Sequence, residues 1–232
     1  MWSQVQADLE KMLAAKIFPA LLEDAVYRSF LVFAGVELSK LGDYSVPPAL
    51  RKNFGTAAKI RAHIIVAEIE KSRALDEDTA GAKLWRGPLT MYRLWDSDAP
   101  ERRVSVWWFE PNVIDVCKKS TPRSAEVRKN WLREHLAVPL DWSKLNRIDY
   151  ISLTADDELP AIVGSGKPMP VYSPDAVSTK QSATQPLPMA KTTPKEYFDN
   201  FGKSFPGGIR QTILPFIPRA VGMDINAFLS KG

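Results

Sequence analysis

Along the first third of the chain, apolar residues recur every three or four positions, which is the period of an α-helix. The opening stripe consists of Val5, Leu9, Met12, Leu13, Ile17 and Leu21. Pro19 lies inside it and is expected to kink or end that helix, because proline has no backbone N–H to donate. A second helix is predicted over residues 25–41, and a third ends in the charged stretch 71–78. The third contains Ile60, Ile64, Ala67 and Glu68. The pattern therefore predicts a helical N-terminal region over residues 1–80.

After a Gly-Pro pair at residues 87–88 the pattern changes to short aromatic and β-branched runs bounded by turn residues, which is typical of β-strands. The predicted strands cover residues 89–95, 104–109, 147–154, 161–163, 169–172 and 209–216. Helices are predicted among them over residues 124–136 and near Asp224, and the composition of residues 173–204 predicts a long mobile loop. Helices followed by strands favour an α+β fold, with a helical N-terminal third and a small, mainly antiparallel β core over residues 81–232.

Composition narrows the class of protein. Hydrophobic residues make up 45% of the chain and charged residues 25%, which is ordinary for a folded domain. One cysteine, Cys117, excludes an internal disulfide, and with only His63 and His135 beside it a structural zinc site is not expected. The apolar run Phe30–Val36 is far shorter than the roughly 20 residues that span a bilayer, and no signal peptide is evident. We expect a soluble protein without a membrane span, cytoplasmic or exported by a dedicated secretion system.

The positive charge lies in the last third of the chain. Residues 1–159 carry equal numbers of basic and acidic side chains, whereas residues 160–232 carry eight basic and four acidic ones. Basic surface attracts phosphate-bearing ligands and nucleic acid, although charge runs are most often solvated loops. The sequence contains no nucleotide-binding or hydrolase motif. Gly164–Lys167 lacks the spacing of a phosphate-binding loop and is expected to be a turn.

Four short segments carry candidate chemistry. The first places Arg93 in an apolar strand, where the charge needs a partner or a cleft. In the second, alternation sends Ser105 and Trp107 to one strand face and Trp108 to the other, and a tryptophan offers a flat surface for stacking. The third is a helix end that carries Arg133. The fourth is a glycine turn that allows close approach of a ligand, followed by a glutamine: its residues are Gly207, Gly208 and Gln211.

In this order, residues 89–215 resemble the ADP-ribosyltransferase-like toxins, including NAD glycohydrolases of the tuberculosis-necrotizing-toxin type. The resemblance implies a bacterial toxin or effector that consumes NAD as its substrate, without a metal, as a glycosidase (NAD glycohydrolase) or an ADP-ribosyltransferase. It implies that Arg93 and Gln211 are catalytic. The residues implied to contact NAD are Arg93, Ser105, Trp107, Arg133, Gly207 and Gly208. Implied partners are a macromolecular ADP-ribose acceptor and an immunity or chaperone protein.

The chain departs from that family at two positions. Transferases of the family place a glutamate on the last strand, whereas Gln211 can donate and accept hydrogen bonds but supplies no negative charge. The family's hydrolases often carry a histidine on a middle strand, and here the corresponding segment offers Arg147 or Tyr150. Either could substitute, or the chain could be an inactive relative.

Two other classes of function fit the sequence. A nucleic-acid-binding or mobile-element accessory protein would use the basic last third together with Tyr197, Phe198 and Phe201 for base stacking. A structural or partner-binding component would dock another helix through residues 1–75. The first would bind in a salt-sensitive way without turnover, and the second would lose assembly on removal of its N-terminal helices.

Overall fold

The computed structural model describes most of the β-rich region and parts of the N-terminal region. The described residues are 1–14, 59, 62–67, 69–70, 74–97, 107–138, 143–167, 169–170, 204–205, 207–215 and 220–231. The predicted helix over 25–41, the side chain of Ser105 and almost all of the predicted loop over 173–204 lie outside these residues.

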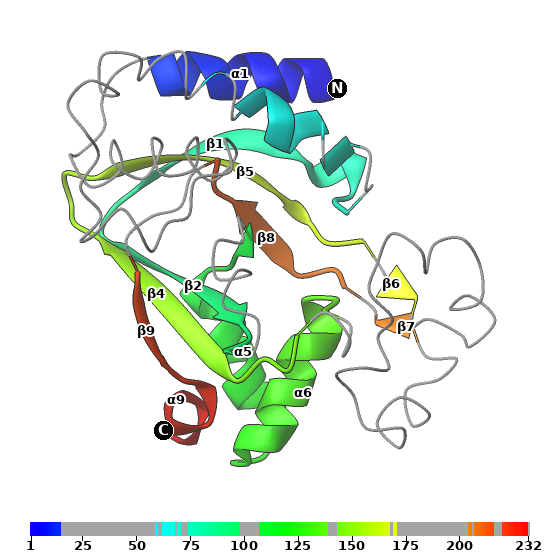
Figure 1. The fold of residues 1–232 in the computed structure, drawn as a ribbon, viewed down its shortest axis with the longest axis vertical. Helices are drawn as coiled ribbons and strands as arrows, with labels where there is room; N and C mark the ends of the chain where they lie inside the picture. Colours follow the sequence, from blue (N-terminus) through cyan, green and yellow to red (C-terminus); the bar gives the residue numbers. More distant parts are fainter. Residues whose placement is uncertain are drawn as a thin grey trace.

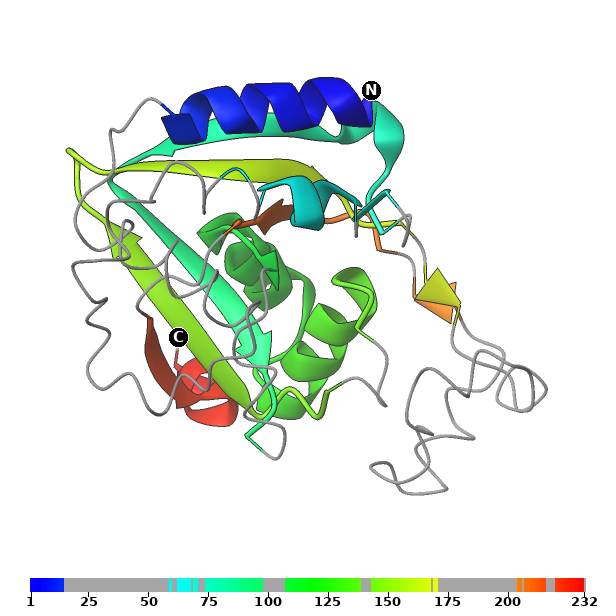
Figure 2. The ribbon, with the colours of Figure 1, turned by 45° about the horizontal axis from the view of Figure 1, so that its top comes forward.

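Helix α1 spans Trp2–Ala14 and confirms the first part of the opening apolar stripe. Its buried side chains are Trp2, Val5, Leu9 and Leu13. Residues 62–67 are also helical, as predicted, and within them Ile65 and Val66 are buried, whereas Ala67 is exposed. In Figures 1 and 2, α1 lies along strands β1 and β5, and its buried residues belong to the same hydrophobic core as those strands.

A four-stranded antiparallel sheet forms the first layer of the β region. Its strands, in spatial order, are β1 (Gly81–Arg86), β5 (Glu158–Ser165), β8 (Arg210–Ile213) and β3 (Trp107–Trp108). Strand β1 was not predicted, because the charged stretch before it was assigned to a fraying helix. That stretch instead contains the 3-10 helix η2 (Glu77–Thr79), with Asp76 as its N-cap. The prediction of a turn at Gly164–Lys167 was wrong at its first two residues, which belong to β5.

A three-stranded antiparallel sheet contains β2 (Leu89–Trp95), β4 (Arg147–Leu153) and β9 (Val221–Asp224), with β4 in the centre. Strand β2 was predicted with these bounds. The two sheets lie at an angle to each other in Figure 1 and are linked through β3. That link is a pair of backbone hydrogen bonds between Tyr92 and Phe109. A separate two-stranded ladder joins β6 (Met169–Pro170) to β7 (Ser204–Phe205).

Three helices cover one side of the three-stranded sheet: α5 (Pro111–Ser120), α6 (Ala125–His135) and α9 (Ile225–Ser230). Helices α6 and α9 were predicted, and their starts follow from side-chain caps, because Ser124 accepts a hydrogen bond from Val127 N and Asp224 from Ala227 N. Helix α5 was missed. Val127, expected on the buried side of α6, is 41% exposed. The fold is therefore α+β with antiparallel sheets, as predicted. Among the described residues, no helix combines the length and apolar character that a membrane crossing requires.

Because side chains alternate along each strand, the four-stranded sheet has two distinct faces. We call the inner face the one that carries Trp108, against which Arg93 of the other sheet lies. From the strand register, its members are Lys83, Trp85, Ala161, Val163, Trp108, Arg210 and Thr212. The outer face carries Trp107, Gln211, Ile213, Ile162 and Gly164. The candidate residues Trp107 and Gln211 therefore lie on the outer face, opposite to Trp108.

Candidate functional site

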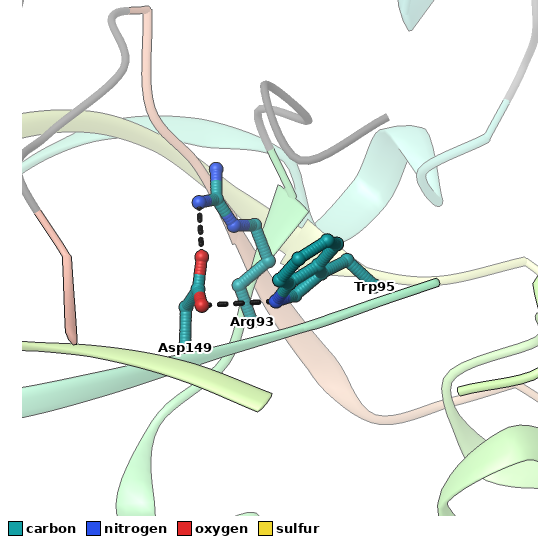
Figure 3. A network of polar contacts seen from close by, with 3 residues as sticks. All are labelled: Arg93, Trp95 and Asp149. Atoms are coloured by element: carbon teal, nitrogen blue, oxygen red, sulfur yellow. Dashed lines mark hydrogen bonds and ion pairs between the residues drawn. The ribbon is translucent and has the colours of Figure 1, made fainter. Parts of the chain in front are cut away.

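Arg93 lies in a buried polar network on the three-stranded sheet (Figure 3). Strand register pairs it with Asp149, and its Nη2 donates to Asp149 Oδ2 at 2.6 Å. The other carboxylate oxygen accepts from Trp95 Nε1 at 2.9 Å. Arg93 is 2% exposed and Asp149 is fully buried. A buried charge is tolerated only with such a partner. The sequence analysis expected Arg93 to need either a partner or a cleft, and Asp149 is the partner.

The Arg93 guanidinium also lies over the Trp108 ring, with 4.5 Å from Cζ to the ring centroid. Such cation–π contacts stabilise a buried arginine further. The resemblance implies that Arg93 is catalytic and contacts NAD. Its guanidinium is instead held between the Asp149 carboxylate and an indole ring, which neutralises its charge and fixes its position. In this structure Arg93 therefore positions the Trp108 side chain rather than presenting a cation to solvent.

Arg133, near the end of α6, also bonds within the protein. Its Nη1 donates to the carbonyl oxygens of Ser143 at 2.8 Å and Val138 at 3.2 Å, and the residue is 4% exposed. The chain turns here through Ala137, whose φ is 52°, so the arginine holds the carbonyls of the segment that leaves the helix. The geometry gives Arg133 a role in closing that turn.

Gln211 is buried on the outer face of β8, where its Nε2 donates to the Leu136 carbonyl at the end of α6 at 3.2 Å. A Cβ at Gly166 would lie 2.5 Å from that Nε2, so only glycine leaves room for the glutamine there. The predicted turn is present: Gly207 and Gly208 have φ of 61° and 81°, a region that favours glycine. A Cβ at Gly207 would meet the chain's own carbonyls at 2.7 Å, so the close approach at this turn is to the backbone.

The two tryptophans of β3 lie on opposite faces, as alternation predicted. Trp107 pairs with Ile213 on the outer face, and Trp108 pairs with Thr212 on the inner face. The structure thus brings Trp107, Gln211 and the end of α6 together on one side. It places Arg93 on the other side, so the predicted set does not meet at one surface.

The inner face carries candidate residues that the sequence did not single out. Lys83 Nζ lies 3.1 Å from the centroid of the Trp85 ring. Burial lowers the pKa of Lys83, the Arg210 guanidinium lowers it further, and Glu110 opposes the shift. In strand register, Lys83 of β1 and Arg210 of β8 lie on the same face of the sheet, with β5 between the two strands. The signal was hidden because Lys83 belongs to a strand that was not predicted, and Arg210 was counted only as tail charge.

Two buried donors lie side by side on the same face. Trp108 is 1% exposed and Thr212 is fully buried, and they are register partners across β3 and β8. In the part of the chain that the structure describes, neither Trp108 Nε1 nor Thr212 Oγ1 has a hydrogen-bond partner. Nearly all buried polar atoms in folded proteins are satisfied, and each exception calls for an explanation such as a ligand or water.

The remaining candidate chemistry is limited. Cys117 is fully buried, burial raises the pKa of its thiol, and its Sγ donates to the Arg128 carbonyl, so it is an inert core residue. Within the described ranges, no three His, Cys, Asp or Glu side chains gather as a metal site would require. The arrangement can therefore supply cations, aromatic surfaces and hydrogen-bond donors on the inner face.

Chemically, the inner face carries groups that suit anionic oxygens and a flat ring, set beside buried core side chains such as Ala161 and Val163, and on the outer face Gln211 bonds within the protein. Comparison with known proteins adds no relative: no family model, no curated protein and no solved structure matches this chain.

Proposed function

We propose that this chain is an NAD-consuming enzyme of the ADP-ribosyltransferase-like type, a glycohydrolase or a transferase, with NAD bound on the inner face. One observation carries the proposal: among the described residues, the inner face joins the Arg93–Trp108 stack to buried donors without a hydrogen-bond partner, of which Trp108 Nε1 and Thr212 Oγ1 belong to register partners. An indole ring held rigid by a guanidinium gives a base or a nicotinamide ring a fixed neighbour. The adjacent donors suit the carbonyl or hydroxyl oxygens of such a ligand.

The predicted residues take new roles in this proposal. Arg93 and Arg133 are positioning residues, because each donates to groups of the protein itself. Gln211 is also a positioning residue: it ties β8 to the end of α6. That tie supports the neighbouring Thr212 from the opposite face of the strand.

Cleavage of NAD at the nicotinamide bond develops positive charge on the ribose, which a nearby carboxylate stabilises. Asp149 is committed to Arg93 and Trp95 through both of its oxygens. We assign this role to Glu110, which lies between β3 and α5. Glu110 occupies the N-cap position of α5 without capping the helix through its side chain, and its charge reaches Lys83 of the inner face. It therefore supplies the negative charge that Gln211 lacks.

The test is NAD consumption by the purified chain, in buffer and in the presence of cell extract that supplies acceptors. Glu110→Gln is expected to lower the rate about 100-fold or more, in the range found when one group that stabilises transition-state charge is removed. Glu126→Gln is the matched control, because that carboxylate pairs with Lys129 on the surface of α6, and it should leave the rate unchanged.

Two outcomes would contradict the proposal. NAD that survives in both buffer and extract would remove the enzyme reading altogether. NAD loss that is equal in the Glu110→Gln variant and in wild type would retain the activity and reject the assigned carboxylate.

A further inference from the structure

Two cations share the inner face of the four-stranded sheet without an acidic partner in contact. Lys83 of β1 and Arg210 of β8 both project to this face by strand alternation. In the described part of the chain neither makes an ion pair, and the contact found for Lys83 is with the Trp85 ring. The Arg210 charge lowers the pKa of Lys83, so it opposes the lysine charge and does not neutralise it. Among the described residues, no contact neutralises these two positive charges.

The charge balance of the face favours an anion. Arg93 and Asp149 cancel each other in their buried ion pair. Among the described residues, Lys83 and Arg210 then stand against the carboxylate of Glu110, which leaves a net positive charge there. The nearby unpartnered groups are an indole N–H, which can only donate, and a hydroxyl, which can donate. A ligand that satisfies all of them needs several anionic acceptor oxygens.

Beside Lys83, the strand face is uncovered at Gly81. Gly81 lies two residues before Lys83 on the same strand face, in the row that continues through Val163 and Thr212 to Trp108. A Cβ built on Gly81 would have no heavy atom within 4 Å. Lys83 is half-buried and Arg210 is exposed, so both can be reached from solvent.

We propose that Lys83 and Arg210 form a phosphate-binding site on the inner face, open at Gly81, with Thr212 and Trp108 as its neutral donors. Arginine binds a phosphate through two parallel hydrogen bonds and lysine acts as a point charge, so the pair suits a phosphate or diphosphate group. The inference deepens the proposed function and rests on it for the identity of the ligand as NAD, whose diphosphate would occupy this site.

The experiment measures binding of pyrophosphate to the full chain by titration calorimetry, with no turnover involved. Lys83→Ala and Arg210→Ala are each expected to weaken binding at least about tenfold, the usual effect of losing one charge-assisted contact. Lys119→Ala removes one positive charge from an exposed position at the end of α5 and is the matched control, with a change below about twofold. Circular dichroism of each variant checks that the fold is retained.

A second variant tests the location without touching charge. Gly81→Leu places an apolar side chain in the open space, and it should weaken pyrophosphate binding as strongly as Lys83→Ala while the chain still folds. Undiminished binding in Gly81→Leu would overturn the location. Equal losses in Lys119→Ala and Lys83→Ala would show attraction by net charge only. Citrate that binds as tightly as pyrophosphate would reject phosphate as the ligand class.

The failure of this inference is distinguishable from failure of the proposed function. If the chain binds pyrophosphate through Lys83 and Arg210 but leaves NAD intact, the phosphate site is retained and the proposed enzyme activity is rejected. If wild type and the Lys83→Ala, Arg210→Ala double variant consume NAD equally well, the proposed enzyme activity is retained and this phosphate site is rejected.

Discussion

The two faces of the strand pair β3–β8 use similar residue types in opposite ways. On the outer face, the polar side chain of Gln211 and the nearby Arg133 donate to backbone carbonyls at the end of α6. On the inner face, Thr212 and Trp108 have buried donors without partners in the described chain, and Lys83 lies against an indole ring. Buried donors without a partner also occur elsewhere in the described residues, at Trp2 Nε1 and Arg128 Nε, so such a donor alone does not mark a site. What distinguishes the inner face is that its unsatisfied donors share that face with two cations, Lys83 and Arg210.

The largest effect is expected when the buried ion pair between Arg93 and Asp149 is broken. Asp149→Ala leaves the buried Arg93 without its carboxylate and removes the acceptor of Trp95. Removing one partner of a buried pair typically costs about 3–5 kcal/mol of unfolding free energy. Urea denaturation should show this loss, and Asp115→Ala, an exposed carboxylate of α5, should change stability by less than about 0.5 kcal/mol.

If Asp149→Ala were no more destabilising than Asp115→Ala, the Arg93 charge would not be neutralised by this pair. Arg93 would then return to the set of groups available to NAD, as the resemblance implies.

The second test asks whether Arg133 belongs to the structure or to the ligand. Arg133→Met keeps most of the side-chain volume but leaves the Ser143 and Val138 carbonyls without their donor. Hydrogen bonds from charged groups contribute about 1.5–3 kcal/mol, so a loss of roughly 2–3 kcal/mol is expected in urea denaturation. Pyrophosphate affinity should change less than about twofold. A stable variant with strongly reduced affinity would place Arg133 in the binding site instead.

Local rules predicted the elements whose signals are local. Strand β2 and helix α6 follow from an aromatic run and from the Ser124 cap, and both match their predicted positions closely. Helix α5 was missed because its N-cap, Glu110, makes no side-chain capping bond, so the signal that marks the start of α6 is absent there. Strand β1 was missed because the charged residues before it resembled a fraying helix, and only its pairing with β5 establishes it.

The site was harder to predict because partners are set by register between distant segments. The sequence identified Arg93 as an arginine in need of a partner, but Asp149 becomes its neighbour only when β2 and β4 pair. Alternation correctly separated Trp107 from Trp108, yet not which of the two would face Arg93. No local pattern joins Lys83 to Arg210, which are over 120 residues apart and share a face only through β5.

A smaller effect is expected at the contact between Gly166 and Gln211. Gly166→Ala forces the Gln211 amide away from its position and thereby breaks its bond to the Leu136 carbonyl. One such hydrogen bond contributes about 1 kcal/mol. Gln211→Ala should cost a similar amount, and the double variant no more than either single one, because both changes remove the same contact. Thermal or urea unfolding of the four proteins measures the coupling, and additive losses would show that the two residues act independently.

The smallest and most specific effect concerns the pH dependence of pyrophosphate binding. The ammonium of Lys83 binds the anion and its pKa lies below the ordinary 10.5, so affinity should fall as pH rises toward 10, before an ordinary lysine loses its proton. Lys83→Arg stays charged throughout, and its curve supplies the titration of the ligand itself for subtraction. Arg210 is one cause of the lowered pKa, so Arg210→Ala should weaken binding at neutral pH and yet shift the midpoint upward. Parallel curves for wild type and Lys83→Arg would remove Lys83 from the site, whereas an upward shift requires the two cations to lie close together on the inner face.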